Sequence, residues 1–262
     1  MGKTYLTREF ARTHWENVAE INFYENSEAK EAVSSAKNAR ELFLRLSAYL
    51  PCPLSPGKTV IFLDEIQEVK EVATAIKFLM ERGDFDYILS GSMLGVELKS
   101  IKSNPVGFMS TLVMYPLDFE EFCWAIGVSE GARQTIRDAC ISERPIPDYI
   151  HDAMMANFRT YTVVGGMPEV VQRFLDTQGD LASVRQLQSE LNEQYRRDIS
   201  KYASGRALQV QSIYDQLPIM LEGENKRFVL NSIDPKAHYE KYQRDFVWLV
   251  DAGVALKADI VT

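Results

Sequence analysis

The sequence has little of what marks several common classes of protein. Lysine and arginine together number 29 against 37 aspartates and glutamates, and the formal net charge is -8. This balance excludes an overall basic surface for nucleic acid and leaves only a local basic patch open. The three cysteines are odd in number and form no CxxC pair, so a disulfide framework is not expected and a reducing compartment is favoured.

Long apolar runs are missing as well. No stretch reaches the roughly 18 apolar residues that a membrane-spanning helix needs, so we expect no membrane partner. Charged residues such as Lys3, Arg8 and Arg12 interrupt the N-terminus, which is therefore unlike a signal peptide. The expected location is the cytoplasm. The three histidines show no HExxH or paired spacing and no GxSxG motif occurs, so neither a metal site of that type nor a serine hydrolase is predicted.

What is present is an ordinary globular composition over 262 residues, enough for one large domain or two small ones. In the first half, apolar strand-like runs alternate with amphipathic helical stretches. The strands are predicted at 18–23, 59–63, 86–92 and 111–117, and the helices at 3–13, 39–50 and 68–82. This alternation predicts an α/β fold with a parallel sheet and helices on both of its faces.

The second half reads almost entirely as helix. The predicted helices are 118–126, 130–141, 147–163, 168–176, 180–201, 206–217 and 235–251, and VALKADIVT at the end begins a further strand. No internal repeat and no low-complexity segment is present.

Residues 2–4, Gly-Lys-Thr, stand directly before the first helix. A phosphate-binding loop ends in this way, with backbone N–H groups at a helix start, a lysine for the phosphates and a hydroxyl for Mg²⁺. The tripeptide alone is weak, because it should occur by chance in roughly one chain in ten of this length.

A second motif is TVIFLDEIQ at 59–67, an apolar run that ends in Asp64 and Glu65. In a nucleotide hydrolase, a strand delivers two carboxylates in this way: Asp64 would hold Mg²⁺, directly or through water, and Glu65 would act as general base. The ordinary alternative is a strand followed by an acidic helix start. A third motif, ILSGS at 88–92, offers Ser90, or alternatively Ser92, as a residue that senses the γ-phosphate or orients the water; taken alone, a plain strand end is the better explanation of this motif.

Several motifs in order, GKTYLTREFA, TVIFLDEIQ, LSGSMLGVELK, PVGFMSTLVMYPLDFEEF, GGMPEVV and YRRDISKYA, resemble the prokaryotic AAA-type ATPases in which the ATP-binding domain precedes a domain of unknown function. The resemblance implies an ATP-binding P-loop core over 1–117, a helical lid over 118–205 and an incomplete winged-helix-like segment over 206–262. It implies ATP and Mg²⁺ as ligands. The implied nucleotide-binding residues are Gly2, Lys3, Thr4, Tyr5 and Asp64; Thr4 and Asp64 would also hold Mg²⁺, and Glu65 and Ser90 would be catalytic.

The sequence departs from that family at both ends. The family has a strand, a glycine and four further residues before Gly-Lys-Thr, and a nuclease-like domain after the winged helix. We expect the missing strand to leave 86–90 at an unpaired sheet edge and the phosphate loop short of N–H donors. ATP binding by the chain as written is therefore expected to be weak or absent, and the ATPase activity belongs to a complete protein; a start codon assigned too late would give this sequence.

Other polar clusters have simpler explanations. Asp118, Glu120 and Glu121 are expected to cap a helix and fill its first turn. Gly165 and Gly166 suit a helix stop and restart, with placement of the lid near the nucleotide as the alternative. The basic cluster of 196–201 is expected to face solvent, the alternatives being an arginine finger and a partner contact.

The function expected from the sequence is an AAA-type ATPase in which hydrolysis drives a conformational switch. The competing class is a non-catalytic interaction module that binds protein or DNA. DNA binding through the winged helix has thin support, because lysines and arginines there, such as Lys241 and Arg244, are offset by Glu240, Asp245 and other acids.

Overall fold

A computed structural model describes residues 2–91, 109–203, 205–223, 228–230, 233 and 239–258, apart from the side chains of Ala73, Tyr202 and Tyr239. The chain divides into two compact units. One consists of residues 1–2 with 112–194, and the other of 3–111 with 195–262. In the described part, no helix is long and apolar enough to cross a bilayer.

A three-stranded parallel sheet forms the centre of the unit that holds 3–111. Its strands are β1 (Asn17–Asn22), β2 (Thr59–Asp64) and β3 (Asp86–Leu89), in the order β1-β2-β3. In the register, Asn22 is opposite Asp64 and Leu63 is opposite Leu89. All six residues of β2 are buried, as expected of an apolar central strand. The predicted parallel α/β sheet is therefore confirmed.

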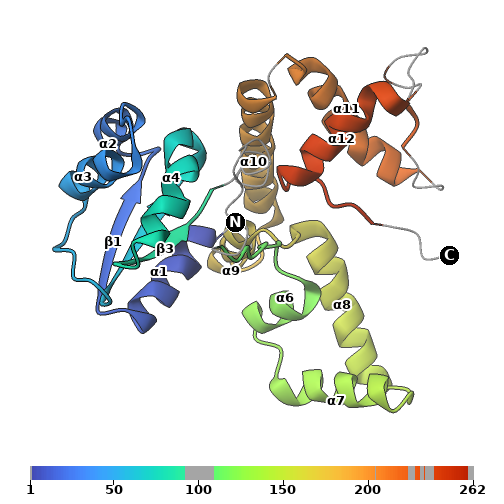
Figure 1. The fold of residues 1–262 in the computed structure, drawn as a ribbon. Helices are drawn as coiled ribbons and strands as arrows, with labels where there is room; N and C mark the ends of the chain where they lie inside the picture. The colour runs from blue at the N-terminus through green and yellow to red at the C-terminus, as the bar shows by residue number, and fades with distance from the viewer. Residues whose placement is uncertain are drawn as a thin grey trace. The chain divides into compact units, whose positions relative to one another are not determined.

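Helices cover both faces of this sheet (Figure 1). They are α1 (Lys3–His14), α2 (Ser27–Ser34), α3 (Ala39–Tyr49) and α4 (Lys70–Glu81), with a short 3-10 turn, η1 (Ile66–Glu68), before α4. The odd-numbered strand residues, among them Ile21, Ile61 and Leu63, share one core with α2, α3 and α4. α1 lies on the other face, where Arg8 donates to both carboxylate oxygens of Glu20 on β1.

Two predicted strands differ from those in the structure. β3 ends at Leu89, earlier than predicted, and among the described residues it pairs with β2 alone. The strand predicted over 111–117 is wrong: these residues form no regular structure, and the side chains of Leu112, Val113 and Tyr115 are exposed. An apolar extended run becomes a strand only beside another strand that completes its hydrogen bonds, and no such neighbour lies among the described residues.

The unit of 112–194 is helical. It contains α6 (Phe119–Ala125), α7 (Glu130–Ile141), α8 (Asp148–Val164), α9 (Pro168–Asp176) and most of α10 (Leu181–Tyr202). Phe122, Val164, Val170, Val171, Val184 and Leu187 form its buried core. A close backbone approach joins two of its loops, since the Leu117 N–H donates to the Gly166 carbonyl at 2.7 Å, and a Cβ on Gly166 would overlap the Leu117 carbonyl oxygen.

Asp118 and its two neighbouring glutamates have the structural role expected of them. The Asp118 side chain accepts from the Glu121 backbone N–H at 2.8 Å, and the Glu121 carboxylate accepts from the Asp118 N–H at 2.9 Å. This reciprocal pair is a capping box at the start of α6. Phe122, one residue further on, is fully buried.

The C-terminal helices α11 (Ala207–Glu222) and α12 (Tyr239–Asp251) pack around a core that includes Ile199, Ile213 and Leu249. Arg206 donates to both oxygens of Asp245, a carboxylate that is 2% exposed. Residues 254–258, the described part of the predicted final strand, form no strand. The remainder of that strand and residues 235–238 of the predicted helix 235–251 lie outside the described residues, so the winged-helix-like segment stays a prediction.

Candidate functional site

The three strands end in one row of polar side chains. Asn22 is the last residue of β1, Asp64 is the last residue of β2, and Ser90 directly follows β3. The parallel register places Asn22 opposite Asp64, and the Ser90 N–H donates to the Leu63 carbonyl at 2.9 Å. Ligand sites of open α/β sheets lie outside the carboxyl ends of the strands, so this row marks the edge at which to look for one.

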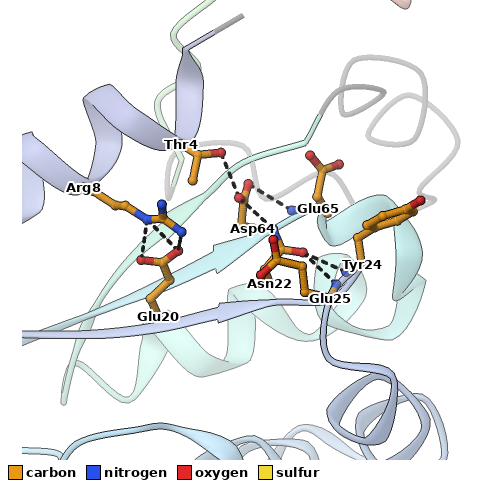
Figure 2. A network of polar contacts seen from close by, with 8 residues as sticks. All are labelled: Thr4, Arg8, Glu20, Asn22, Tyr24, Glu25, Asp64 and Glu65. Atoms are coloured by element: carbon orange, nitrogen blue, oxygen red, sulfur yellow. Dashed lines mark hydrogen bonds and ion pairs between the residues drawn. The ribbon is translucent and has the colours of Figure 1, made fainter. Parts of the chain in front are cut away.

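Thr4, at the start of α1, reaches the tip of β2. Its hydroxyl donates to Asp64 Oδ2 at 2.9 Å, across 60 residues of sequence (Figure 2). The Gly-Lys-Thr motif and the Asp-Glu motif therefore meet in space. Because the Thr4 hydroxyl donates its single proton to Asp64, the lone pairs of its oxygen remain available to a cation.

Lys3 and its neighbours lie at the same edge. The Lys3 ammonium donates to the Gly91 carbonyl at 3.1 Å, just beyond β3. Burial lowers the pKa of Lys3 below its ordinary value, while the negative charges of Glu65 and Asp64 raise it. Gly2 has a φ of 68°, a left-handed conformation that glycine adopts at little cost, and the Tyr5 side chain is exposed.

Glu65 has an unusual backbone. Its φ of 54° and ψ of 44° are left-handed, which is uncommon for a residue other than glycine. Its N–H donates to Asp64 Oδ1 at 3.1 Å, and its own carboxylate accepts from the Gln67 side chain. Strained conformations of this kind cluster at functional sites, and here the strained residue is the predicted general base.

Ser90 carries a hydroxyl that lacks a partner. The residue is 7% exposed, and its Oγ makes no hydrogen bond to any residue that the structure describes. A buried hydroxyl without a partner is costly, so a site that supplies one on ligand binding explains it well. The alternative residue, Ser92, lies outside the described residues.

Asn22 is the site residue that sequence reasoning missed. Its Nδ2 donates to Asp64 Oδ2 at 3.1 Å, and its Oδ1 accepts from the N–H groups of Tyr24 and Glu25 (Figure 2). The available signal was its place at the carboxyl end of a predicted parallel strand. That place became meaningful only once the strand was known to be next to β2.

The basic cluster of Arg196, Arg197 and Lys201 faces solvent, as expected, and two of its members also form ion pairs. Arg196 pairs with Asp215 at 3.0 Å. Lys201 pairs at 2.6 Å with Glu68, a carboxylate that also binds Lys30 at 2.5 Å and has a side chain only 8% exposed. Glu68 belongs to η1, directly after the Asp-Glu motif, so the segment that follows Glu65 is held from two directions.

Comparison with known proteins agrees with this geometry. Residues 1–123 match the family model described as "AAA domain". Residues 1–123 form an AAA-type P-loop domain. The resemblance drawn from the motifs is thereby confirmed for this part of the chain, and an AAA domain supports an ATP-binding P-loop ATPase in general. Residues 155–261 match a second model, "Domain of unknown function (DUF8612)".

A solved structure supports the AAA fold. The chain is similar to the Walker-type ATPase PABY2304 of Pyrococcus abyssi, with a TM-score of 0.58 and 16% sequence identity. The match covers 98% of this chain and 83% of that one, and at this identity it speaks for the fold alone. No curated protein matches the chain.

The residues at the strand tips of the AAA domain suit Mg²⁺, the ion that ATPases of this type typically bind with ATP. The Thr4 hydroxyl, the Asp64 carboxylate and the unpartnered Ser90 hydroxyl are all oxygen donors. Hard divalent cations prefer such oxygens, and Mg²⁺ is commonly held by one or two carboxylates together with nucleotide phosphates.

Proposed function

We propose that the carboxyl edge of the β1-β2-β3 sheet binds ATP with Mg²⁺ and hydrolyses it. The observation that carries this proposal is the 2.9 Å hydrogen bond between Thr4 and Asp64. It brings together the two motifs that a P-loop ATPase needs, one for the phosphates and one for the metal and water.

Each residue has a role that follows from its chemistry. The Lys3 ammonium gives up its hydrogen bond to the Gly91 carbonyl, binds phosphate oxygens and neutralises their charge. The backbone N–H groups of Gly2 and Tyr5 donate to the phosphates. Thr4 and Asp64 hold Mg²⁺, with Asp64 acting directly or through water. The bound ion supplies charge neutralisation at the β- and γ-phosphates.

Hydrolysis needs a base and an oriented water. The Glu65 carboxylate takes a proton as the water oxygen bonds to the γ-phosphorus, and the bond from that phosphorus to the β–γ bridging oxygen breaks. Gln67 orients Glu65 through its hydrogen bond. The buried Ser90 hydroxyl gains a partner when a γ-phosphate oxygen or the attacking water is present.

We assign the conformational response to the segment after Glu65. Glu68 lies three residues further on and binds Lys30 of α2 and Lys201 of α10. A shift of η1 on hydrolysis would therefore change the ion pairs that hold α2 and α10. The helical lid and the winged-helix-like segment are the parts that we expect to respond.

The test is nucleotide binding with and without Mg²⁺, measured by calorimetry on the purified protein. Lys3→Ala removes a charge-assisted contact and should weaken ATP binding about 10- to 100-fold. Lys58→Ala is the matched control, because Lys58 makes only a surface pair with Glu16 and should leave affinity unchanged. Equal affinity in both variants would favour the non-catalytic interaction module instead.

A further inference from the structure

Asn22 is bonded at both ends of its side chain. Two backbone N–H groups, from Tyr24 at 2.9 Å and Glu25 at 3.1 Å, donate to its Oδ1. The oxygen of the amide is therefore the end that faces the turn, since the NH₂ group cannot accept these bonds. The NH₂ group is left facing Asp64, to which it donates at 3.1 Å.

The Asp64 carboxylate is nearly saturated by its neighbours. Oδ2 accepts from both Thr4 and Asn22, and Oδ1 accepts from the Glu65 N–H. A carboxylate has about four acceptor positions, so the one that remains belongs to Oδ1. With Asp64 only 1% exposed, its rotation is set by these three donors.

From this geometry we propose that Asn22 is a positioning residue that fixes the Asp64 carboxylate and leaves the remaining acceptor position of Oδ1 for Mg²⁺ or for water bound to it. The inference rests on the proposed function and deepens it, because it names the residue through which β1 contributes to the metal site. In the proposed site Thr4 would also contact Mg²⁺, whereas the Asn22 side chain is anchored to the backbone N–H groups of Tyr24 and Glu25.

The readout is the ratio of the ATP dissociation constants without and with Mg²⁺, because it isolates the metal from the rest of nucleotide binding. Residues that orient a metal ligand typically change metal affinity about 10- to 100-fold when removed. Asn22→Ala should therefore reduce the ratio about 10-fold, while ATP affinity without Mg²⁺ stays close to that of the native protein.

A matched control separates the positioning of Asp64 from the stabilisation of a backbone turn. Asn26 lies four residues further on, where its Oδ1 accepts from the Ala29 N–H at 2.9 Å and caps α2. Asn26→Ala should lower stability and leave the ratio unchanged. Asn22→Asp keeps the acceptor for Tyr24 and Glu25, and so should fold, but sets a second carboxylate against Asp64. It loses the amide N–H donor to Asp64, so its ratio should fall as that of Asn22→Ala does.

A double-mutant cycle decides between outcomes. If Asn22 acts through Asp64, Asn22→Ala adds nothing to the loss caused by Asp64→Asn. A native ratio with Asn22→Ala or with Asn22→Asp would overturn the positioning role while Asp64→Asn still collapses the ratio. If Asp64→Asn also leaves the ratio unchanged, or the native protein shows no Mg²⁺ effect, the proposed function fails together with this inference.

Discussion

Two acidic segments of this chain look alike in sequence and differ in structure. TVIFLDEIQ and VMYPLDFEEF are both apolar runs that end in an aspartate followed by further acids. Asp64 is buried and accepts from residues 60 and 42 positions away, whereas Asp118 is exposed and pairs with Glu121 three positions away. Asp64 is thus held by partners from two other elements at the end of the sheet, while Asp118 is held by its own turn and acts as a helix cap.

The largest expected effect is on catalysis. Glu65→Gln removes the general base and should reduce ATP hydrolysis about 10²- to 10⁴-fold, with little change in nucleotide affinity. Glu121→Gln is the matched change in the other acidic segment and should leave hydrolysis at the native rate. Phosphate release at saturating ATP measures both variants. Equal losses in the two would remove the distinction between site and cap.

In the helical unit, the largest expected effect on stability comes from the close backbone packing at Gly166. Gly166→Ala forces a Cβ against the Leu117 carbonyl oxygen, so we expect a loss of about 2–3 kcal/mol in the free energy of unfolding. Gly131 lies inside α7 with open space around it, and Gly131→Ala should be neutral or stabilising by up to about 1 kcal/mol. Urea denaturation compares the two; a harmless Gly166→Ala would contradict the close backbone approach.

The cap itself should be worth less. Asp118→Ala removes the capping-box acceptor at the start of α6 and should cost about 1 kcal/mol of unfolding free energy. Nucleotide affinity should not change, in contrast to the Mg²⁺ dependence lost with Asp64→Asn. Thermal unfolding and calorimetry on the same preparation check both statements. A large loss of affinity in Asp118→Ala would place this segment in the site after all.

The smallest effect is a titration. Burial raises the pKa of Tyr87 on β3 from 10.0 to about 12. The folded state thus keeps a proton that the unfolded state loses, so stability present below pH 10 should decline as the pH rises toward 12. Tyr87→Phe should flatten that decline and remove the highest tyrosinate step from an absorbance titration. An unchanged titration would show that Tyr87 is more hydrated than the structure has it.

Much of the fold could be predicted from the sequence, because its central strands and amphipathic helices have clear periodicity. The β2 strand and the position of Asp64 follow from one apolar run. Two elements could not be predicted. α2 is only eight residues long and buries little beyond Ala29 and Val33, so its pattern is weak. The segment 111–117 has strand-forming residues, but its structure depends on a neighbour that the pattern does not specify.

The site was predictable to a similar degree. Lys3, Thr4, Asp64 and Glu65 belong to motifs with recognisable spacing, and the structure brings Thr4 and Asp64 into contact. Asn22 belongs to no motif. Its importance comes from strand order and register, which place β1 beside β2, and a single sequence does not fix the order of parallel strands.

The left-handed backbone of Glu65 sets stability against activity at one position. In this conformation a residue with a side chain loses about 1–2 kcal/mol of conformational free energy relative to glycine. Glu65→Gly would therefore relieve the backbone strain and stabilise the loop. The same replacement would remove the proposed general base. Attempts to make this protein more heat-resistant by relieving unfavourable backbone angles should thus leave position 65 unchanged, because the strained residue is the proposed general base.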